Sequence, residues 1–286
     1  MNPRSLLLVL GCAFALLFLL ERRFPLRRRT CSVLGRLTAN LAVAALAFGT
    51  AAVTVRPVVL SLLGWTAARD FGLVYLLPLP GAGRAVLGFL LMDLAFYYWH
   101  RVNHRWPFLW RFHNVHHIDP DLDVSTSFRF HFGEVVLSVA FRVIQVTFSG
   151  VSGWTYGVYE LAFQLNTLFH HSNLRLPIAV ERPLNRLLVT PRMHGIHHSQ
   201  VRRETDSNFS VVLSWWDRLH GTLRLNVPRD AIAIGVPAYT LSGDRTLWHG
   251  LTLPFRRQRE YWLRPDGERV ERDPAELGSD LHRLEA

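Results

Sequence analysis

The sequence contains no lysine and only two cysteines, Cys12 and Cys31, both close to its start. This placement leaves no cysteines for a thiolate zinc site, an iron–sulfur cluster or a disulfide framework in the rest of the chain. The sequence also has no glycine-rich dinucleotide fingerprint, so it offers no recognisable nicotinamide or flavin site. Redox chemistry in this chain would therefore need other metal ligands and an external source of electrons.

Charged residues are scarce, and all of the permanently cationic side chains are those of arginine. Charged residues make up 19% of the 286 residues, against 49% hydrophobic residues, and the formal net charge is +10. A basic chain binds polyanions, and the long apolar runs here favour a membrane surface over nucleic acid.

Three long apolar runs predict membrane segments. Ser5–Leu20 is almost uninterrupted, and most of the nearby positive charge follows it, which is the pattern of a membrane anchor rather than of a signal peptide. Leu37–Leu63 is the second run and is interrupted at Arg56-Pro57. Ala85–Trp99 is the third and leads directly into His100.

Two shorter apolar runs predict a hairpin. Val135–Phe148 and Trp154–Phe169 are separated by a turn-like Ser/Gly joint at 149–153. Both are shorter than the ~20 residues of a full span, so we expect the hairpin to cross the membrane only partly. Arg142 lies inside the first run and must face protein or water, because a charge in lipid is costly.

Arginine positions predict the orientation of these segments. The loop between the first two runs carries Arg22, Arg23, Arg27, Arg28 and Arg29. A loop this basic is expected to be cytoplasmic. If each later segment crosses the membrane in turn from this loop, every clustered histidine lies at the cytoplasmic face. We therefore expect a protein of a bacterial-type inner membrane whose histidine clusters and C-terminus are cytoplasmic.

The histidines are the most informative residues. Eight of the 14 form three clusters with helical spacing: His100 and His104; His113, His116 and His117; His194, His197 and His198. Residues at i, i+3 and i+4 share a helix face, so each cluster can present its imidazoles to one side. Pro107 and Thr190-Pro191 predict that the helices of the two H-x-x-H-H triplets begin shortly before them. A single structural zinc needs four ligands, so this number indicates two metals.

Two other functional classes share part of this pattern. A membrane metal transporter, or a metal-binding membrane protein without oxidase activity, also combines histidines with apolar runs. Transporters often carry histidines in loop tracts or in mid-span, whereas these lie in helical clusters at the ends of spans. A haem protein would use one or two axial ligands and leave most of the histidines unexplained. Metal content separates the three classes.

Several motifs follow one another in a fixed order over roughly residues 85–225. They are Asp93, Tyr98–Arg101 with His104, Trp110–His117, Arg129–His131 with Glu134, His171–Asn173, Thr190–His198, Asp206–Phe209 and Trp216–Thr222. In order and spacing this set resembles the fatty acid hydroxylase/sterol desaturase superfamily of integral-membrane, non-haem di-iron enzymes. Phe132 stands where proline is usual in that family, and His220 stands where phenylalanine is usual.

The resemblance implies an all-α, integral-membrane bundle of about four membrane helices or hairpins under a cytoplasmic, histidine-rich helical cap. From the sequence itself we expect residues 1–84 to form N-terminal membrane anchor helices and residues 226–286 a polar cytoplasmic tail, whose charged part Arg256–Ala286 is a solvated surface segment; residues 85–225 would be the catalytic domain. The metal ligands implied are His100, His104, His113, His116, His117, His131, His171, His194, His197 and His198. His170 stands where glutamine is expected and is left out, and His220, His249 and His282 lie outside the pattern.

The function implied is that of a membrane-bound, O2-dependent lipid oxidoreductase of lipid biosynthesis. Two iron ions would activate O2 to hydroxylate or desaturate an unactivated C–H position of a sterol, fatty acyl or related lipid, and zinc could replace iron in isolated protein. A ferredoxin- or cytochrome-type carrier would supply electrons. Asp93, Glu134 and Asp206 are candidates to accept the second ring N–H of ligand histidines, with helix capping as the alternative role.

Overall fold

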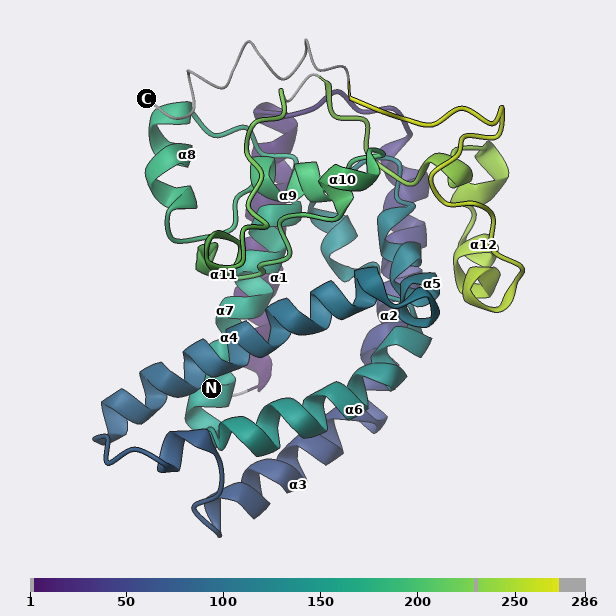
Figure 1. Cartoon of the computed structure of the whole chain (residues 1–286). Coiled ribbons are helices and arrows are strands. Elements are labelled where there is room, and N and C mark those ends of the chain that lie inside the picture. Colours follow the sequence, from purple (N-terminus) through teal and green to yellow (C-terminus); the bar gives the residue numbers. More distant parts are fainter. Residues whose placement is uncertain (1–2, 229–230, 273–286) are drawn as a thin grey trace.

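The computed structural model describes residues 3–228 and 231–272 and shows an all-helical protein, as predicted. Within those residues strand pairing is limited to isolated bridges. The long helices are α1 (Pro3–Arg23), α2 (Val33–Val53), α3 (Val55–Ala67), α4 (Gly81–Arg105), α6 (Phe132–Ser149) and α7 (Gly153–His171). The short helices are α5 (Pro107–His117), α8 (Ile178–Asn185), α9 (Pro191–His197), α10 (Arg202–Thr205), α11 (Trp215–Leu219) and α12 (Leu247–Thr252). Helices α8–α12 lie in the upper half of Figure 1, away from α3 and α6 at its foot.

Three helical stretches in the described residues are long and apolar enough to cross a membrane. They are Arg4–Arg23, Val33–Ala67 and Phe132–Ser149. The first two contain the first two predicted runs, and the third contains the first half of the predicted hairpin. The runs Ala85–Trp99 and Trp154–Phe169 form α4 and α7, although neither helix is among these three candidates. The predicted orientation remains a prediction.

The second apolar run is two helices rather than one. α2 ends at Val53, and α3 begins at Val55. Pro57 has no amide N–H, and its ring would clash with the carbonyl of Val53, so the helix breaks there, as the interruption in the run predicts. After the break α3 runs beside α6 (Figure 1).

The predicted hairpin forms from α6 and α7. Gly150 ends α6 with φ of +70°, a left-handed conformation that glycine adopts without strain. A Cβ atom on Gly150 would collide with the backbone of Phe71 and Gly72, so the turn can pack closely there only because it lacks a side chain. Arg142 pairs with Glu160 across the hairpin at 2.8 Å and thus faces protein, as predicted.

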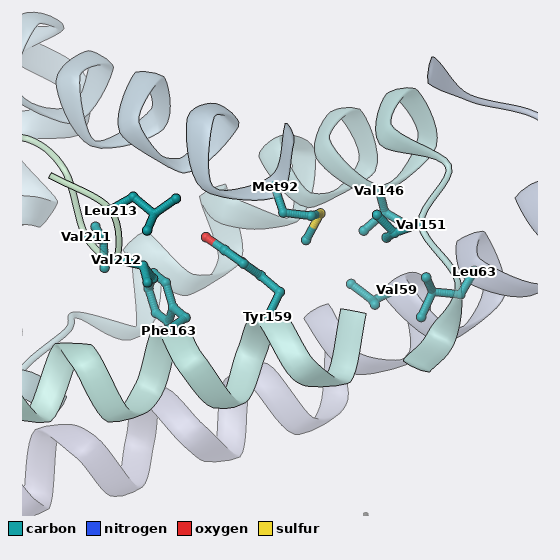
Figure 2. Close-up of a cluster of buried hydrophobic side chains, with 10 residues drawn as sticks. All are labelled: Val59, Leu63, Met92, Val146, Val151, Tyr159, Phe163, Val211, Val212 and Leu213. Carbon is teal, nitrogen blue, oxygen red and sulfur yellow. The ribbon is translucent and has the colours of Figure 1, made fainter. Parts of the chain in front are cut away.

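One hydrophobic cluster joins the long helices to the segment that follows α10. Its buried members are Val59, Leu63, Met92, Val146, Val151, Tyr159, Phe163 and Val211–Leu213 (Figure 2). Full burial of a side chain of this size contributes roughly 1.5–3 kcal/mol to stability. The cluster therefore holds the 211–213 segment firmly against α4 and α7, two long helices that carry histidines in their last turns.

The C-terminal part of the described chain packs on α5. Trp110 lies in a second buried cluster with Val236, Tyr239 and Leu253, and Tyr261 and Trp262 pack against it. Part of the predicted polar tail is therefore buried against the histidine-bearing helix, whereas the segment expected to be solvated begins only at Arg256. Residues 273–286, including His282, lie outside the described residues, and the predicted domain boundaries remain a prediction.

Candidate metal centre

Nine histidines converge in two adjacent groups. The first group contains His100, His104, His113, His117 and His197, and the second contains His116, His171, His194 and His198. In each group, one nitrogen from every ring lies within 4.8 Å of the corresponding nitrogens of the others. The groups are in contact, because the ring of His117 stacks on that of His198 with centroids 4.2 Å apart.

Each H-x-x-H-H triplet is divided between the two groups. Its first and last histidines, at i and i+4, belong to one group. Its middle histidine, at i+3, is offset from them around the helix and belongs to the other group. The two divisions are opposite. Helix α5 gives its pair His113 and His117 to the first group, whereas α9 and the residue after it give His194 and His198 to the second. Each short helix therefore contributes to both groups.

Proline starts both of these helices. Pro107 and Pro191 are the first helical residues of α5 and α9, as predicted. Thr190 is the N-cap residue of α9, but its hydroxyl donates a hydrogen bond to Glu181 Oε1 at 3.0 Å instead of capping the helix. The start of α9 is therefore held from outside, by α8.

The second group has ring nitrogens that point at one another. His171 Nε2 lies 3.0 Å from His116 Nε2 and 3.0 Å from His194 Nε2, and His198 Nε2 lies 3.1 Å from His194 Nε2. A metal ion with bonds of ~2.0–2.1 Å to nitrogen holds its ligand atoms at about this separation. The donor set therefore fits a metal ion.

The first group contains buried nitrogens without partners. Within the described residues the Nε2 atoms of His104, His113, His117 and His197 make no hydrogen bond and are shielded from solvent. Buried polar atoms left in this way cost free energy unless a further group binds them. Imidazole nitrogen is a suitable ligand for iron, zinc or copper, so this group also fits a metal ion.

Burial favours the neutral form of His197 and His117. Burial lowers the pKa of His197 to about 3, although a hydrogen bond to the Ser207 carbonyl opposes the shift and His113 and His171 add to it. The pKa of His117 also falls well below its ordinary value, through burial and the neighbouring rings. Neutral imidazole is the form that binds metals, so at neutral pH both groups are ready for ligation.

Backbone carbonyls orient several of the rings. His100 Nδ1 lies 2.8 Å from the carbonyl oxygen of Phe209, and His197 Nδ1 lies 2.7 Å from that of Ser207. His171 makes a similar contact within α7. With the proton on Nδ1, each ring leaves Nε2 free for a metal. The sequence gives no signal for these acceptors, because every residue has a carbonyl.

Two of the three predicted carboxylate acceptors do not contact a ligand histidine. Asp93 accepts hydrogen bonds from the backbone N–H of Leu213 at 3.0 Å and from Trp216 Nε1 at 2.8 Å. It therefore fixes the 213–216 segment rather than a ring. Asp206 ends α10 and lies 3.9 Å from Arg202, where the capping or pairing alternative applies.

Glu134 is the carboxylate that does contact a ligand histidine, since its Oε1 atom lies 2.9 Å from His113 Nδ1. Replacing Glu134 by alanine should lower metal content or turnover by roughly 10–100-fold, because His113 loses the acceptor that orients it. Glu134→Gln keeps an acceptor oxygen and should lose less. Asp206→Asn is the matched control and should behave like the wild type. Equal losses in Glu134→Ala and Asp206→Asn, measured by metal analysis, would contradict this role.

The structure places His131 outside both groups. Its Nδ1 accepts a hydrogen bond from the N–H of Gly133 at 2.9 Å, which makes it the N-cap of α6, and its Nε2 lies 3.1 Å from the carbonyl oxygen of Leu251. Both ring nitrogens are thus engaged, and the expectation that His131 binds metal is corrected. Its position begins the helix that presents Glu134.

The remaining histidines differ in their surroundings. His170 is buried, its ring centroid lies 4.1 Å from that of His194, and it belongs to neither group. His220 Nε2 lies 2.7 Å from the hydroxyl of Tyr98, and His249 is on α12. His220 and His249 are separate from the two groups, as expected.

Two adjoining cavities lie near the histidines. A small one of about 40 Å³ is lined by rings from both groups and by His170. A larger one of about 270 Å³ is bordered by α2, α6 and α7 and is mostly apolar. The two share the wall residues Phe96, Trp99, Phe130, Glu134, Phe163 and Thr167. The larger cavity therefore adjoins the small one that the histidine rings line.

Comparison with known proteins gives a consistent family match. The family model described as fatty acid hydroxylase matches residues 85–222, which include all nine grouped histidines. The ornithine lipid hydroxylase OlsE of Rhizobium tropici is 31% identical over 180 residues, covering 63% of this chain and 52% of that protein. Human alkylglycerol monooxygenase is 28% identical over 177 residues, covering 62% and 38%. Human cholesterol 25-hydroxylase is 28% identical over 138 residues, covering 47% and 49%.

These similarities have a limited extent. The chain spans about half or less of the length of these relatives, at 52%, 38% and 49%. No solved structure matches the chain at a significant level.

Proposed function

The chain belongs to the fatty acid hydroxylase family, and on that premise we propose that it is a membrane-bound, O2-dependent lipid hydroxylase with a histidine-ligated di-iron centre. One observation carries the proposal: rings from two groups of buried imidazoles line a small cavity that shares its wall with a mostly apolar cavity bordered by the candidate membrane helices α2 and α6. The similar proteins are two hydroxylases and a monooxygenase, which favours hydroxylation over desaturation.

The nine grouped histidines would hold the two iron ions, one in each group. Bound iron would supply the activation of O2 and the oxidation of a C–H bond. The chain's own residues position and shield this chemistry. Backbone carbonyls and Glu134 fix the rings, and Trp99, Phe130 and Phe163 line the approach, so an alkyl chain can reach the centre while bulk water is kept out.

Comparative lipidomics tests the proposal most directly. Cells that produce the chain should contain a lipid that is heavier by one oxygen and absent from cells producing the His197→Ala variant. A product lighter by two hydrogens would instead identify a desaturase. An unchanged lipid profile would contradict the proposal. Purified protein should contain about two irons per chain, and tight haem binding would exclude the di-iron assignment.

A separate carrier would supply the electrons, and we propose that it docks at a basic hollow. The hollow, of about 280 Å³, is lined by Arg27, Arg28, Arg29 and Arg245 among others. Gly195 has no side chain, so the guanidinium of Arg27 lies directly against α9 within the second triplet. A positive surface beside a metal-bearing helix suits an acidic carrier of the ferredoxin or cytochrome type.

Charge reversal in this hollow tests the docking surface. The double variant Arg28→Glu/Arg29→Glu should lower the rate of reduction by an acidic carrier by roughly tenfold or more at low salt, because electrostatic steering is lost. The wild-type rate should fall as ionic strength rises, and the variant rate should change little. Arg203→Glu, on the exposed side of α10, is the matched control. Carrier-dependent turnover that is insensitive to salt in the wild type would reject steering.

A further inference from the structure

An ion pair lies inside the larger cavity. Arg142 on α6 and Glu160 on α7 are 2.8 Å apart, and their side chains are only 11% and 24% exposed. Both line the cavity, together with Tyr156 and Gln164. The guanidinium also lies over the ring of Phe96, 5.9 Å from its centroid. The cavity therefore has a polar end within walls that are otherwise mostly apolar.

A purely structural role explains this pair poorly. Apolar side chains of similar volume would join α6 to α7 at least as well, because desolvation offsets much of the attraction between buried charges. Ionisable residues within membrane segments usually face a cavity or a transport path and serve function there. The exposed part of Glu160 opens on the cavity, where a bound molecule can reach it.

The polar end of the larger cavity and the histidines, which line the adjoining small cavity, lie at different positions along α6. Glu134 lines the cavity and contacts His113, whereas Arg142 lies two helical turns further along α6. Eight residues of α-helix correspond to about 12 Å along the axis. A lipid whose polar group sits at Arg142 would therefore present a carbon well along its chain to the histidines.

On the basis of the proposed function, we propose that the Arg142–Glu160 pair binds the polar group of the lipid substrate and so selects the carbon that is oxidised. The guanidinium donates hydrogen bonds, and the carboxylate accepts them. A neutral group that both accepts and donates, a hydroxyl or an amide, satisfies the two together. A free carboxylate would be repelled by Glu160, and a hydrocarbon would satisfy neither. The substrate class is an alkyl lipid with a hydroxyl or amide group.

Photo-crosslinking of the full chain in lipid nanodiscs tests this subsite without turnover. The probes are hexadecan-1-ol carrying a diazirine near its methyl end and hexadecane carrying the same group. The alcohol should label residues at the histidine end of the cavity, such as Phe130 and Thr167, at least roughly tenfold more than the alkane. This preference should disappear in the double variant Arg142→Leu/Glu160→Leu. Ser138→Ala, which alters the same cavity wall, should keep it.

Equal labelling by both probes in the wild type, or an unchanged preference in the double variant, would overturn the proposal. If the double variant does not fold, Glu160→Gln serves instead, because it keeps the side-chain shape but removes the charge. It should lower the preference for the alcohol probe over the alkane probe. In oxidised lipids, the product position should be constant when counted from the polar group as chain length varies. Constancy counted from the methyl end would overturn the subsite, whereas absence of any oxidised lipid would contradict only the proposed function.

Discussion

Replacing His197 by alanine should abolish turnover and lower the bound iron from about two per chain to about one. His197 contributes one of the buried, unpaired nitrogens of the first group, and the Ser207 carbonyl holds its ring in place. Changing residues that merely orient a ligand costs roughly 10–100-fold, so removing a ligand should cost more. Metal analysis of purified protein and mass spectrometry of the lipid product measure the two effects.

Two other histidines provide the controls for this experiment. His249 lies on α12, outside both groups, and His282 falls outside the described residues. His249→Ala and His282→Ala should both stay near wild-type activity and metal content. Retained turnover in His197→Ala would reject the metal assignment, and an equal loss in all three variants would indicate a general sensitivity to histidine replacement.

The ligand triplets could be predicted from the sequence because their geometry is local. Spacing of i, i+3 and i+4 places three rings on one side of a helix whatever surrounds it. The division of each triplet between two groups could not be predicted in this way. It depends on how α5 and α9 face each other, which is decided by contacts far apart in the chain, such as Trp110 with Trp262 and Arg27 with Gly195.

Of the three predicted carboxylates, the structure places only Glu134 beside a grouped histidine. Glu134 lies on the first turn of α6 and reaches His113, 21 residues away. Asp93 shares a helix stripe with His100, yet its partner Leu213 is 120 residues away. Helical spacing shows which side of α4 carries Asp93, but the element packed on that side follows from tertiary structure.

His131 shows the limit of carrying roles over by motif. It occupies a histidine position of the family pattern, but here the ring caps α6 through the N–H of Gly133. Capping by a side chain needs only an acceptor before the first helical turn, which histidine can supply. A motif match therefore fixes the residue type more firmly than it fixes its role.

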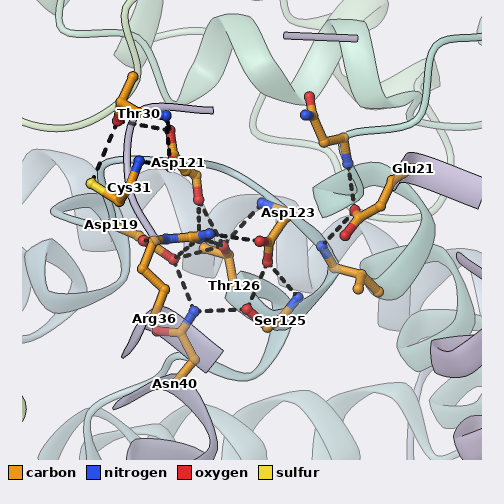
Figure 3. Close-up of polar contacts among 12 residues, drawn as sticks. Glu21, Thr30, Cys31, Arg36, Asn40, Asp119, Asp121, Asp123, Ser125 and Thr126 are labelled. Atoms are coloured by element: carbon orange, nitrogen blue, oxygen red, sulfur yellow. Dashed lines mark hydrogen bonds and ion pairs between the residues drawn. The ribbon is translucent and has the colours of Figure 1, made fainter. Parts of the chain in front are cut away.

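A buried ionic network fixes the chain immediately behind α5, where both groups take ligands. Arg36 on α2 donates from Nε to Asp119 Oδ1 at 2.7 Å and from Nη1 to Asp123 Oδ2 at 2.6 Å (Figure 3). Asn40 Nδ2 also donates to Asp119 at 3.0 Å. Because Asp119 follows His117 by two residues, the network connects an apolar helix with the end of a ligand helix.

Replacing Asp119 by alanine should lower the free energy of unfolding by roughly 3–5 kcal/mol, because the charge of Arg36 would stay buried with less compensation. Thermal unfolding followed by circular dichroism measures the loss. Asp266→Ala, at an exposed position, is the control and should change stability by about 0.5 kcal/mol or less. A melting temperature for Asp119→Ala equal to that of the control would contradict a stabilising network.

The carboxylate of Asp119 should also make the free energy of unfolding depend on pH. Burial alone would raise the pKa of Asp119, but the charge and hydrogen bonds of Arg36 more than offset burial and lower it from 3.8 to about 2. The folded-state pKa is thus below the unfolded one, so the contribution is complete above about pH 4 and is lost as the pH falls towards 2. In Asp119→Asn, the loss of stability between about pH 4 and pH 2 should be smaller than in the wild type.

The double variant Arg36→Met/Asp119→Met separates the two causes of the loss. If an uncompensated buried charge destabilises Asp119→Ala, removing the arginine as well should recover part of the stability, even though every Arg36 contact disappears. Asp123 keeps hydrogen bonds from Ser125 in that variant, so it is not left without partners. A double variant less stable than Asp119→Ala would instead mean that the attraction itself, together with the packing of Arg36 against the 119–126 turn, provides the stability.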